Sequence, residues 1–299
     1  MRCICMQITF LGTGGGRVNL IKQLRGTGGF LISGSANIYV DPGPGALLSS
    51  IKYGIDLATV NALVITHNHI DHMNDAALVI EAMTGYAMDK KGMLFASKFS
   101  LEGGGNFDRA LSRYHLSLIP EKYLLESGKT LKIKQKKKDG SLAEFELEGI
   151  KTKHDETSAF GFKLRMDGKV IGYTSDTEFF ADLPELWKGC DILIVNNLKP
   201  MHDGIPDHLA SEDTVKILKV AQPKLAILSH IGMKLIKEGP EFEAERITSE
   251  SGVHTIAARD GMIIDCKSLA FSMALEKKQR SAKPDSGTIS KLSDFEADA

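Results

Sequence analysis

The feature that most constrains this chain is a run of metal-binding residue types placed directly behind a short apolar segment. Residues 62–65 are Ala-Leu-Val-Ile, and the histidines and the aspartate that follow all fall within residues 67–72. Imidazole and carboxylate at this density favour zinc, or another borderline divalent ion, over calcium and magnesium, which prefer oxygen ligands. We therefore expect a fold in which a buried strand ends at a metal site.

The spacing within this run predicts two metal positions rather than one. His67 and His69 lie two residues apart, so on an extended segment their side chains point the same way. Asp71 and His72 are adjacent and cannot both join them at a single ion without strain. A histidine-rich surface loop is the alternative, but His-x-His-x-Asp-His is far more specific than a pair of histidines.

The composition is that of an ordinary globular protein. Of the 299 residues, 42% are hydrophobic and 25% are charged, and the net charge of -1 argues against extended nucleic-acid binding. The cysteines, at positions 3, 5, 190 and 266, lack the spacing of a zinc ribbon, which favours a reduced, cytoplasmic protein. No run approaches the ~18 apolar residues of a membrane span, and no signal peptide is recognisable, so we expect no membrane partner.

Short apolar runs that end in polar residues predict a layered α/β protein. Continuously apolar strands are usually buried on both faces, so helices should cover the sheets. The expected strands cover residues 8–11, 36–40, 62–65, 145–152, 169–174, 192–195 and 225–228, and helical spacing marks residues 75–83 and 211–220. Polar strand ends should gather at one edge, where ligand sites form in such folds. We expect one domain over residues 1–273 and a disordered tail over 274–299.

Residues 132–138 include five lysines and precede Asp139-Gly140, which predicts a lysine-rich hairpin. Such hairpins are commonly solvated sheet edges, and the balanced overall charge favours that interpretation. A nucleic-acid contact is the alternative.

Three isolated strand-end residues, His154, Asp176 and His230, complete the pattern, and the sequence then resembles the metallo-β-lactamase superfamily of binuclear metallohydrolases. The resemblance covers residues 6 to 265, and its carriers are residues 10–14, 40–43, 67–72, 153–155, 173–176 and 228–230. It implies a four-layered αββα sandwich with the metals at one edge of the two sheets. It also implies two sets of ligands joined by a bridging residue: His67, His69 and His154; Asp71, His72 and His230; and Asp176 between them.

The expected cofactors are two divalent ions, zinc first, with manganese or iron as alternatives. Such a pair can lower the pKa of a bound water from about 15.7 toward about 7 and so produce a hydroxide nucleophile at neutral pH. Asp71 could accept a proton from the nucleophile as well as bind metal. Asp41, at another strand end, either orients a ligand histidine or caps the turn that follows it.

Two details bear on the substrate. The bridging position is Asp176, whereas many true β-lactamases of the superfamily carry cysteine there, so β-lactam hydrolysis is not expected as the main activity. His208, just before the helix start at Ser211, resembles an element of the RNase Z and phosphonate-pathway phosphodiesterase branch that binds or protonates the phosphoryl group. The alternative for His208 is a residue that leads into a helix without a catalytic part.

The glycine-rich residues 12–16, with Arg17 and residues 25–29 behind them, also resemble that branch. Exposed amides with an arginine nearby would suit an anion, although tight turns use the same residues. One departure is important. Asn196-Asn197 stands where RNase Z usually supplies a glutamate partner for the histidine, so His208 is expected to lack a carboxylate partner. A long arm for gripping transfer RNA is not evident in residues 85–149 either, so transfer-RNA processing is not expected.

The sequence therefore predicts a metal-dependent hydrolase, a phosphodiesterase acting on small, cyclic or nucleotide-like phosphodiesters. The alternatives are a lactonase or thioesterase that acts on carboxylic esters at the same metal site, and a binding or sensing protein without turnover. A homodimer is compatible with the family, but no motif marks an interface, and neither the natural substrate nor the native metal is identified.

Overall fold

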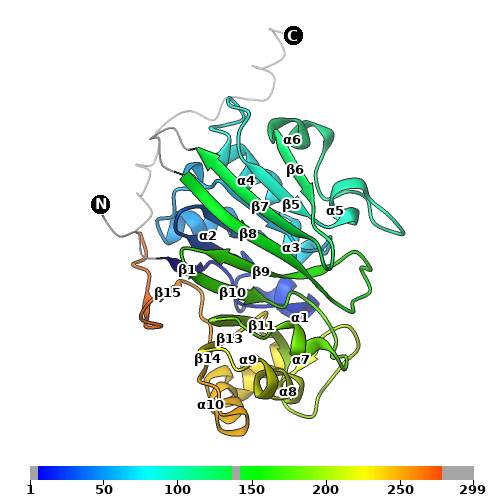
Figure 1. Ribbon diagram of the computed structural model, residues 1–299, viewed down its shortest axis with the longest axis vertical. Coiled ribbons are helices and arrows are strands. Elements are labelled where there is room, and N and C mark those ends of the chain that lie inside the picture. Colours follow the sequence, from blue (N-terminus) through cyan, green and yellow to red (C-terminus); the bar gives the residue numbers. More distant parts are fainter. Residues whose placement is uncertain (1–5, 137–141, 278–299) are drawn as a thin grey trace, which may run out of the picture.

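The computed structural model describes residues 6–136 and 142–277, which form two stacked β-sheets with helices on their outer faces (Figure 1). The first sheet has strand order β16-β15-β1-β2-β3-β4-β5-β6, with β3 to β6 parallel and the other neighbours antiparallel. Its strands are β1 (Gln7–Phe10), β2 (Phe30–Ser33), β3 (Asn37–Val40), β4 (Ala62–Ile65), β5 (Met93–Ala96), β6 (Glu121–Leu124), β15 (Met262–Asp265) and β16 (Phe271–Met273).

The second sheet has strand order β14-β13-β11-β10-β9-β8-β7, with the short β12 paired to β11. Strands β10, β11, β13 and β14 are parallel, and β7 to β10 form an antiparallel meander. Its strands are β7 (Thr130–Lys136), β8 (Leu142–Lys151), β9 (Phe160–Met166), β10 (Lys169–Tyr173), β11 (Ile192–Lys199), β12 (Leu209–Ala210), β13 (Leu225–Ser229) and β14 (Thr255–Ala257).

Helices connect the parallel strands, and some of their ends are readable in the sequence. The helix α8 starts where the Asp213 carboxylate accepts the backbone N–H of Ala210, and α10 starts with Pro240 and ends at the left-handed Gly252. The helices are α1 (Gly16–Lys22), α2 (Ala46–Lys52), η1 (Leu57–Thr59, a 3₁₀ turn), α3 (Ile70–Met73), α4 (Ala76–Met83), α5 (Lys98–Glu102), α6 (Arg113–Leu118), α7 (Leu183–Leu186), α8 (Ser211–Ala221), α9 (Met233–Glu238) and α10 (Pro240–Ser251).

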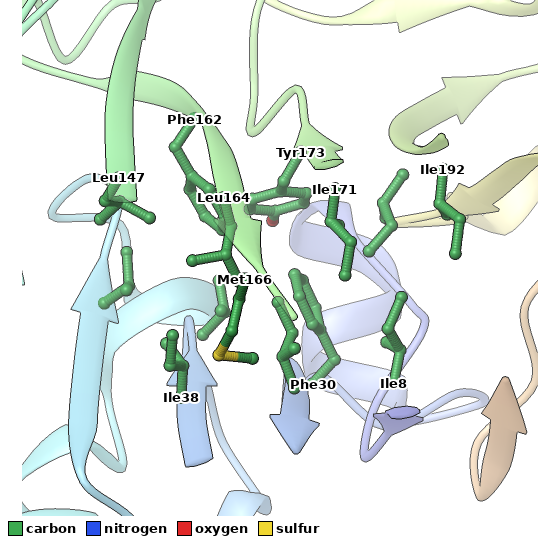
Figure 2. Close-up of a cluster of buried hydrophobic side chains, with 14 of the residues drawn as sticks. Ile8, Phe30, Ile38, Leu147, Phe162, Leu164, Met166, Ile171, Tyr173 and Ile192 are labelled. Atoms are coloured by element: carbon green, nitrogen blue, oxygen red, sulfur yellow. The ribbon is translucent and has the colours of Figure 1, made fainter. Parts of the chain in front are cut away.

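Three apolar clusters separate the layers. One lies between the two sheets and brings Ile8 and Phe30 of the first sheet together with Phe162 and Ile171 of the second (Figure 2). A second cluster packs α8 and α10 on the outer face of the second sheet, and a third packs α4 and α6 on the outer face of the first. This helix–sheet–sheet–helix order confirms the predicted four-layered sandwich, and it explains why the central strands are apolar on both faces.

The predicted strands and helices are present, with boundaries within a few residues of those expected. The lysine-rich hairpin is β7 and β8, and β7 is an edge strand of its sheet; the turn at Asp139-Gly140 lies outside the described residues. Lys132 and Lys134 pair with glutamates of β8 across the hairpin, at 3.3 and 2.8 Å, as a solvated edge would.

Of the predicted tail, residues 278–299 lie outside the described residues. Residues 274–277 do contact the domain, because the backbone N–H groups of Ala274 and Lys277 donate to Gly261 and Lys52. Among the described residues, no helix has both the length and the apolar character needed to cross a membrane.

Candidate metal centre

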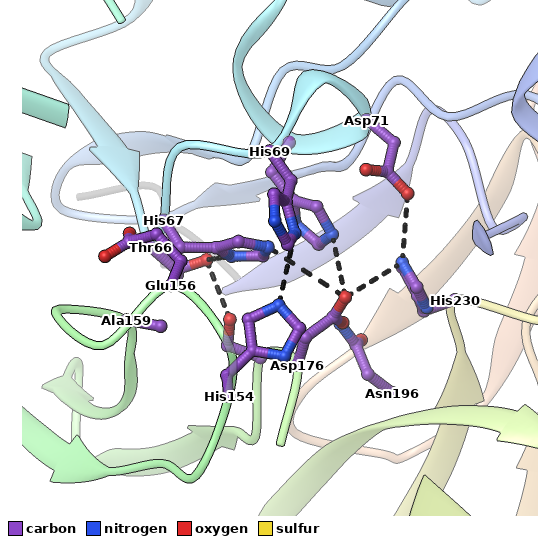
Figure 3. A network of polar contacts seen from close by, with 12 residues as sticks. Thr66, His67, His69, Asp71, His154, Glu156, Ala159, Asp176, Asn196 and His230 are labelled. Carbon is purple, nitrogen blue, oxygen red and sulfur yellow. Dashed lines mark hydrogen bonds and ion pairs between the residues drawn. The ribbon is translucent and has the colours of Figure 1, made fainter. Parts of the chain in front are cut away.

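The seven predicted ligands lie together at one edge of the two sheets, and all of them except His72 are labelled in Figure 3. The run after β4 supplies four of them, and the ends of β8, β10 and β13 supply the others. They form three groups in which one potential ligand atom of each member lies within 4.8 Å of the others: His67, His69 and His154; His67, His72 and Asp176; and Asp71, His72 and His230. These groups overlap at His67 and His72, as two adjacent metal positions would require.

The local backbone after β4 explains how one short run serves both positions. The chain is still extended at His69 (φ -84°, ψ 147°), and α3 begins at the next residue. The change from strand-like to helical backbone turns Asp71 and His72 away from the direction of the two preceding histidines. This agrees with the two positions predicted from the spacing.

The other strand ends hold unusual backbone conformations. Asp41 after β3, Ser175 before Asp176, and His230 after β13 all have positive φ, of 48°, 54° and 53°. Residues other than glycine adopt the left-handed region at a cost of order 1–3 kcal/mol, and such residues cluster at functional sites. Here the sharp turns direct the side chains of the strand-end residues toward the space between the sheets.

The distances between facing atoms fit a metal centre. His69 Nδ1 lies 3.1 Å from His154 Nε2. On the other side, His230 Nε2 lies 3.3 Å from Asp71 Oδ2 and 3.4 Å from Asp176 Oδ2, and His72 Nε2 lies 3.4 Å from the same Asp176 oxygen. Two ligands bound tetrahedrally to one zinc ion at about 2.0–2.1 Å are about 3.4 Å from each other. The donors are therefore already spaced as they would be around metal ions.

Several of these atoms have no hydrogen-bond partner among the described residues. His67 Nε2 and His72 Nε2 are both buried, and neither makes a hydrogen bond with a described residue. Buried polar atoms are nearly always satisfied in native proteins, so unpartnered ones need an explanation. Divalent ions bound between these atoms would satisfy them, and this is the observation on which the fit of the metal centre rests.

Most of the histidines are oriented through their other ring nitrogen. His154 Nδ1 lies 3.0 Å from the carbonyl oxygen of Asp207, which can only accept, so Nδ1 carries the proton and Nε2 keeps its lone pair toward the centre. The outward nitrogens of the other histidines have similar contacts: His67 Nδ1 with Thr66 Oγ1 at 3.1 Å, His69 Nε2 with Asp155 Oδ1 at 3.4 Å, and His72 Nδ1 with Asp41 Oδ2 at 3.0 Å.

Asp41 orients His72 and does not cap the following turn with its side chain. Its Oδ1 accepts the backbone N–H of Thr66, and its Oδ2 accepts the Thr66 hydroxyl as well as lying close to His72. The hydroxyl of Tyr173 also donates to Oδ2, at 3.1 Å. Of the two interpretations of Asp41, the structure supports the orienting one.

The electrostatics favour the metal-binding form of some of the donors. Burial, together with the neighbouring His72, lowers the pKa of His67 well below its usual value, so its ring is neutral. Burial alone would raise the pKa of Asp176, but His230 and His72 more than offset this effect and hold the pKa well below its usual range. Neutral imidazole and ionised carboxylate are the forms that bind metals. Burial lowers the pKa of His72, but Asp176 and Asp41 more than offset this effect and raise it well above its usual value, so a metal ion would have to displace a proton from that ring.

The structure brings His208 to the centre without making it a member of the ligand groups. Its Nε2 lies 3.3 Å from Asp176 Oδ2, and its ring lies 5.4 Å from that of His154 and 5.9 Å from that of His230. The expectation that His208 lacks a carboxylate partner is therefore wrong, because the partner is Asp176. Asn196, at the position of the expected glutamate, instead donates from Nδ2 to Asp176 Oδ1 at 2.7 Å.

Several groups of the glycine-rich loops that were expected to suit an anion already have partners within the protein. The backbone N–H groups of Gly12, Gly14 and Gly15 donate to carbonyl oxygens of other segments, and those of Thr13 and Gly26 donate to the Asp260 carboxylate. Arg25 donates to the carbonyl oxygen of Ala258. These groups hold the loop in place, so they are not free to bind an anion.

Sequence reasoning missed two carboxylates close to the ligands. Asp155, whose side chain is 53% exposed, contacts His69, and its place directly after His154 was the only available signal. Glu156 is fully buried and accepts hydrogen bonds from the backbone N–H of Asn68 and from Ser97 and Ser158. No spacing rule marks Glu156, because its partners come from three separate segments.

Comparisons with known proteins agree with this geometry. The family described as the β-lactamase superfamily domain matches residues 36–231. An uncharacterised protein of Methanocaldococcus jannaschii is 35% identical over 263 residues, which are 87% of this chain and 95% of that protein.

Two solved structures show the same fold. A diphosphatase from the PhnP family has a TM-score of 0.62 at 18% identity, covering 91% of this chain and 100% of its own. Human tRNase Z, short form, has a TM-score of 0.60 at 16% identity, covering 87% of this chain and 98% of its own.

Proposed function

The chain belongs to the metallo-β-lactamase superfamily of metal-dependent hydrolases, and from this premise we propose that it hydrolyses small, cyclic or nucleotide-like phosphodiesters at a binuclear metal centre. Similar structures carry the names diphosphatase and tRNase, which supports a phosphoryl group as the target. Because the fold hosts many reactions, the proposal rests on the residues of the site.

The proposed ligands are the residues that converge at the sheet edge. His67, His69 and His154 would hold one ion, Asp71, His72 and His230 the other, with Asp176 between them. Two divalent ions held there would lower the pKa of a bound water and would polarise a phosphoryl oxygen of the substrate. The Asp71 carboxylate would accept the proton that the attacking water loses.

The observation that carries the phosphodiesterase proposal is the position of His208. It places an imidazole beside both metal positions and outside the ligand groups, with a ring that is 21% exposed. An imidazole so placed can donate a proton or a hydrogen bond to a phosphoryl oxygen or to the leaving group. Its backbone is held through Asp207, whose N–H donates to Glu178 and whose carbonyl accepts from His154.

The test compares His208→Ala with wild-type protein after reconstitution with zinc or manganese. We expect both metals to be retained and phosphodiester turnover to fall by about 10²- to 10⁴-fold, the range for loss of a general acid or base. Lactones and thioesters, which lack the phosphoryl oxygens, should be affected less. Steady-state kinetics on all three substrate classes, with metal content measured in parallel, gives the answer.

The matched control is His202→Asn, because His202 is an exposed histidine of the same loop. It should leave turnover unchanged. If the metal-loaded wild-type protein is inactive on phosphodiesters but active on lactones or thioesters, the proposal is wrong. An equal loss on every substrate class in His208→Ala would mean that His208 has a different role.

A further inference from the structure

The exposure of the rings shows where the metal centre opens to solvent. The side chains of His67, His72, His154 and His230 are between 0% and 7% exposed. His69 and His208 are 24% and 21% exposed. A substrate must therefore approach between His69 and His208, and the residues beside these two rings contact the part of the substrate that projects from the centre.

Phe107 lies on this rim. Its ring centroid is 5.6 Å from that of His69 and 6.3 Å from that of Phe99. The ring is only partly buried and belongs to none of the three apolar clusters formed by the described residues. Packing of the core therefore does not account for an aromatic residue at this position.

The loop that carries Phe107 is tied to the metal-binding run itself. The side-chain amide of Asn68, the residue between His67 and His69, donates to the carbonyl oxygens of Asp108 and Phe99. Gly104 and Phe107 exchange backbone hydrogen bonds at 2.9 Å, which closes the turn between them. The ring is thus held at a fixed place relative to the metal ligands, as a preorganised binding surface requires.

Phe107 also lines a solvent-open groove of about 530 Å³. Its volume is in the range of small-ligand sites, which are about 300–1,000 Å³. Glu102, Asp108 and Arg109 supply charge to its lining. With two carboxylates and one guanidinium, the groove is not basic, and it does not suit the backbone of a nucleic acid. The carboxylates could accept hydrogen bonds from ring amino groups.

We propose that Phe107 is a specificity-determining residue that stacks on an aromatic heterocycle, so that the preferred substrate is a small phosphodiester carrying a nucleobase-like ring. This inference rests on the proposed function, since it takes the phosphoryl group to be at the metals. The ring then lies over Phe107 and reaches into the groove, while the polymer chain of a nucleic acid is excluded.

The test measures binding as well as turnover. Phe107→Leu keeps apolar volume and removes the aromatic face, and Phe107→Tyr keeps the face. Calorimetry on the metal-loaded proteins compares adenosine 5′-monophosphate with inorganic phosphate. We expect Phe107→Leu to weaken binding of the nucleotide by about 5- to 100-fold, which is the effect of losing one base–aromatic stack. The affinity for inorganic phosphate should not change. Phe107→Tyr should bind both ligands as the wild-type protein does.

The matched control is Phe242→Leu, which removes an exposed phenylalanine on α10. The inference is overturned if Phe107→Leu binds the nucleotide as well as the wild-type protein, or if it weakens both ligands equally, since an equal loss would mean disturbance of His69. Turnover of phosphodiesters by the wild-type protein tests the proposed function separately. If the wild-type protein does not hydrolyse phosphodiesters but still binds the nucleotide more tightly than Phe107→Leu does, only the proposed function is contradicted.

Discussion

The two halves of the metal centre are held in place by different physical means. In the three-histidine half, the outward nitrogens of His67, His69 and His154 contact Thr66, Asp155 and the Asp207 carbonyl. In the other half, His72 contacts Asp41, but His230 Nδ1 is buried with no hydrogen-bond partner among the described residues.

Close packing takes the place of that missing hydrogen bond. A Cβ atom added at Gly15 would lie 2.2 Å from the His230 ring, so the glycine backbone touches the imidazole directly. Gly15 itself is held by its N–H, which donates to the carbonyl oxygen of Ile231. A ligand histidine can thus be oriented either by a polar partner or by contact with backbone, and the two arrangements should fail under different substitutions.

The largest expected effect comes from the residue shared by both halves. Asp176→Ala removes the carboxylate that contacts His72, His230 and His208. We expect bound metal to fall below one ion per chain and activity to be lost, with the far-UV circular dichroism unchanged. Metal analysis after reconstitution is the measurement. Retention of two ions would contradict the bridging role.

The second-largest effect should distinguish the two halves of the metal centre by the loss of one metal ion. Gly15→Ala leaves the backbone unstrained, since φ is -144°, but drives a methyl group into the His230 ring. We expect loss of one ion with the other retained, measured as metal stoichiometry. Gly204→Ala is the control, because an added Cβ there meets nothing closer than 3.9 Å. Loss of both ions would mean that the halves are not independent.

The smallest effect should come from a polar partner in the three-histidine half. Asp155→Ala removes a carboxylate oxygen that lies 3.4 Å from His69 Nε2 and 3.3 Å from His154 Nε2. Loss of such an outer partner typically lowers metal affinity by about 10- to 100-fold. The exposure of Asp155 suggests the lower end of that range. Chelator competition measures the affinity, and an unchanged value would show that packing alone orients His69.

Much of the fold was readable from the sequence because its central strands are short, apolar and punctuated by polar residues. The strand at residues 62–65 and the helix that starts at Ser211 were both predicted at the observed places. Several strands were not predicted: β2, β5, β6, β9, β12, β14, β15 and β16. The glycine-rich loop was assigned to an anion because local sequence does not reveal that distant residues such as Asp260 take up its amides.

The sequence identified the candidate metal ligands. The His-x-His-x-Asp-His run encodes donor type and direction over a few residues of local backbone, and the resemblance to the superfamily added His154, Asp176 and His230. Only the tertiary structure decided how those ligands are oriented. Asp41, Asp155, Gly15 and the Asp207 carbonyl reach the histidines from separate segments, and Asp176 rather than position 196 became the partner of His208. Contacts of this kind depend on how two sheets stack, which no local spacing records.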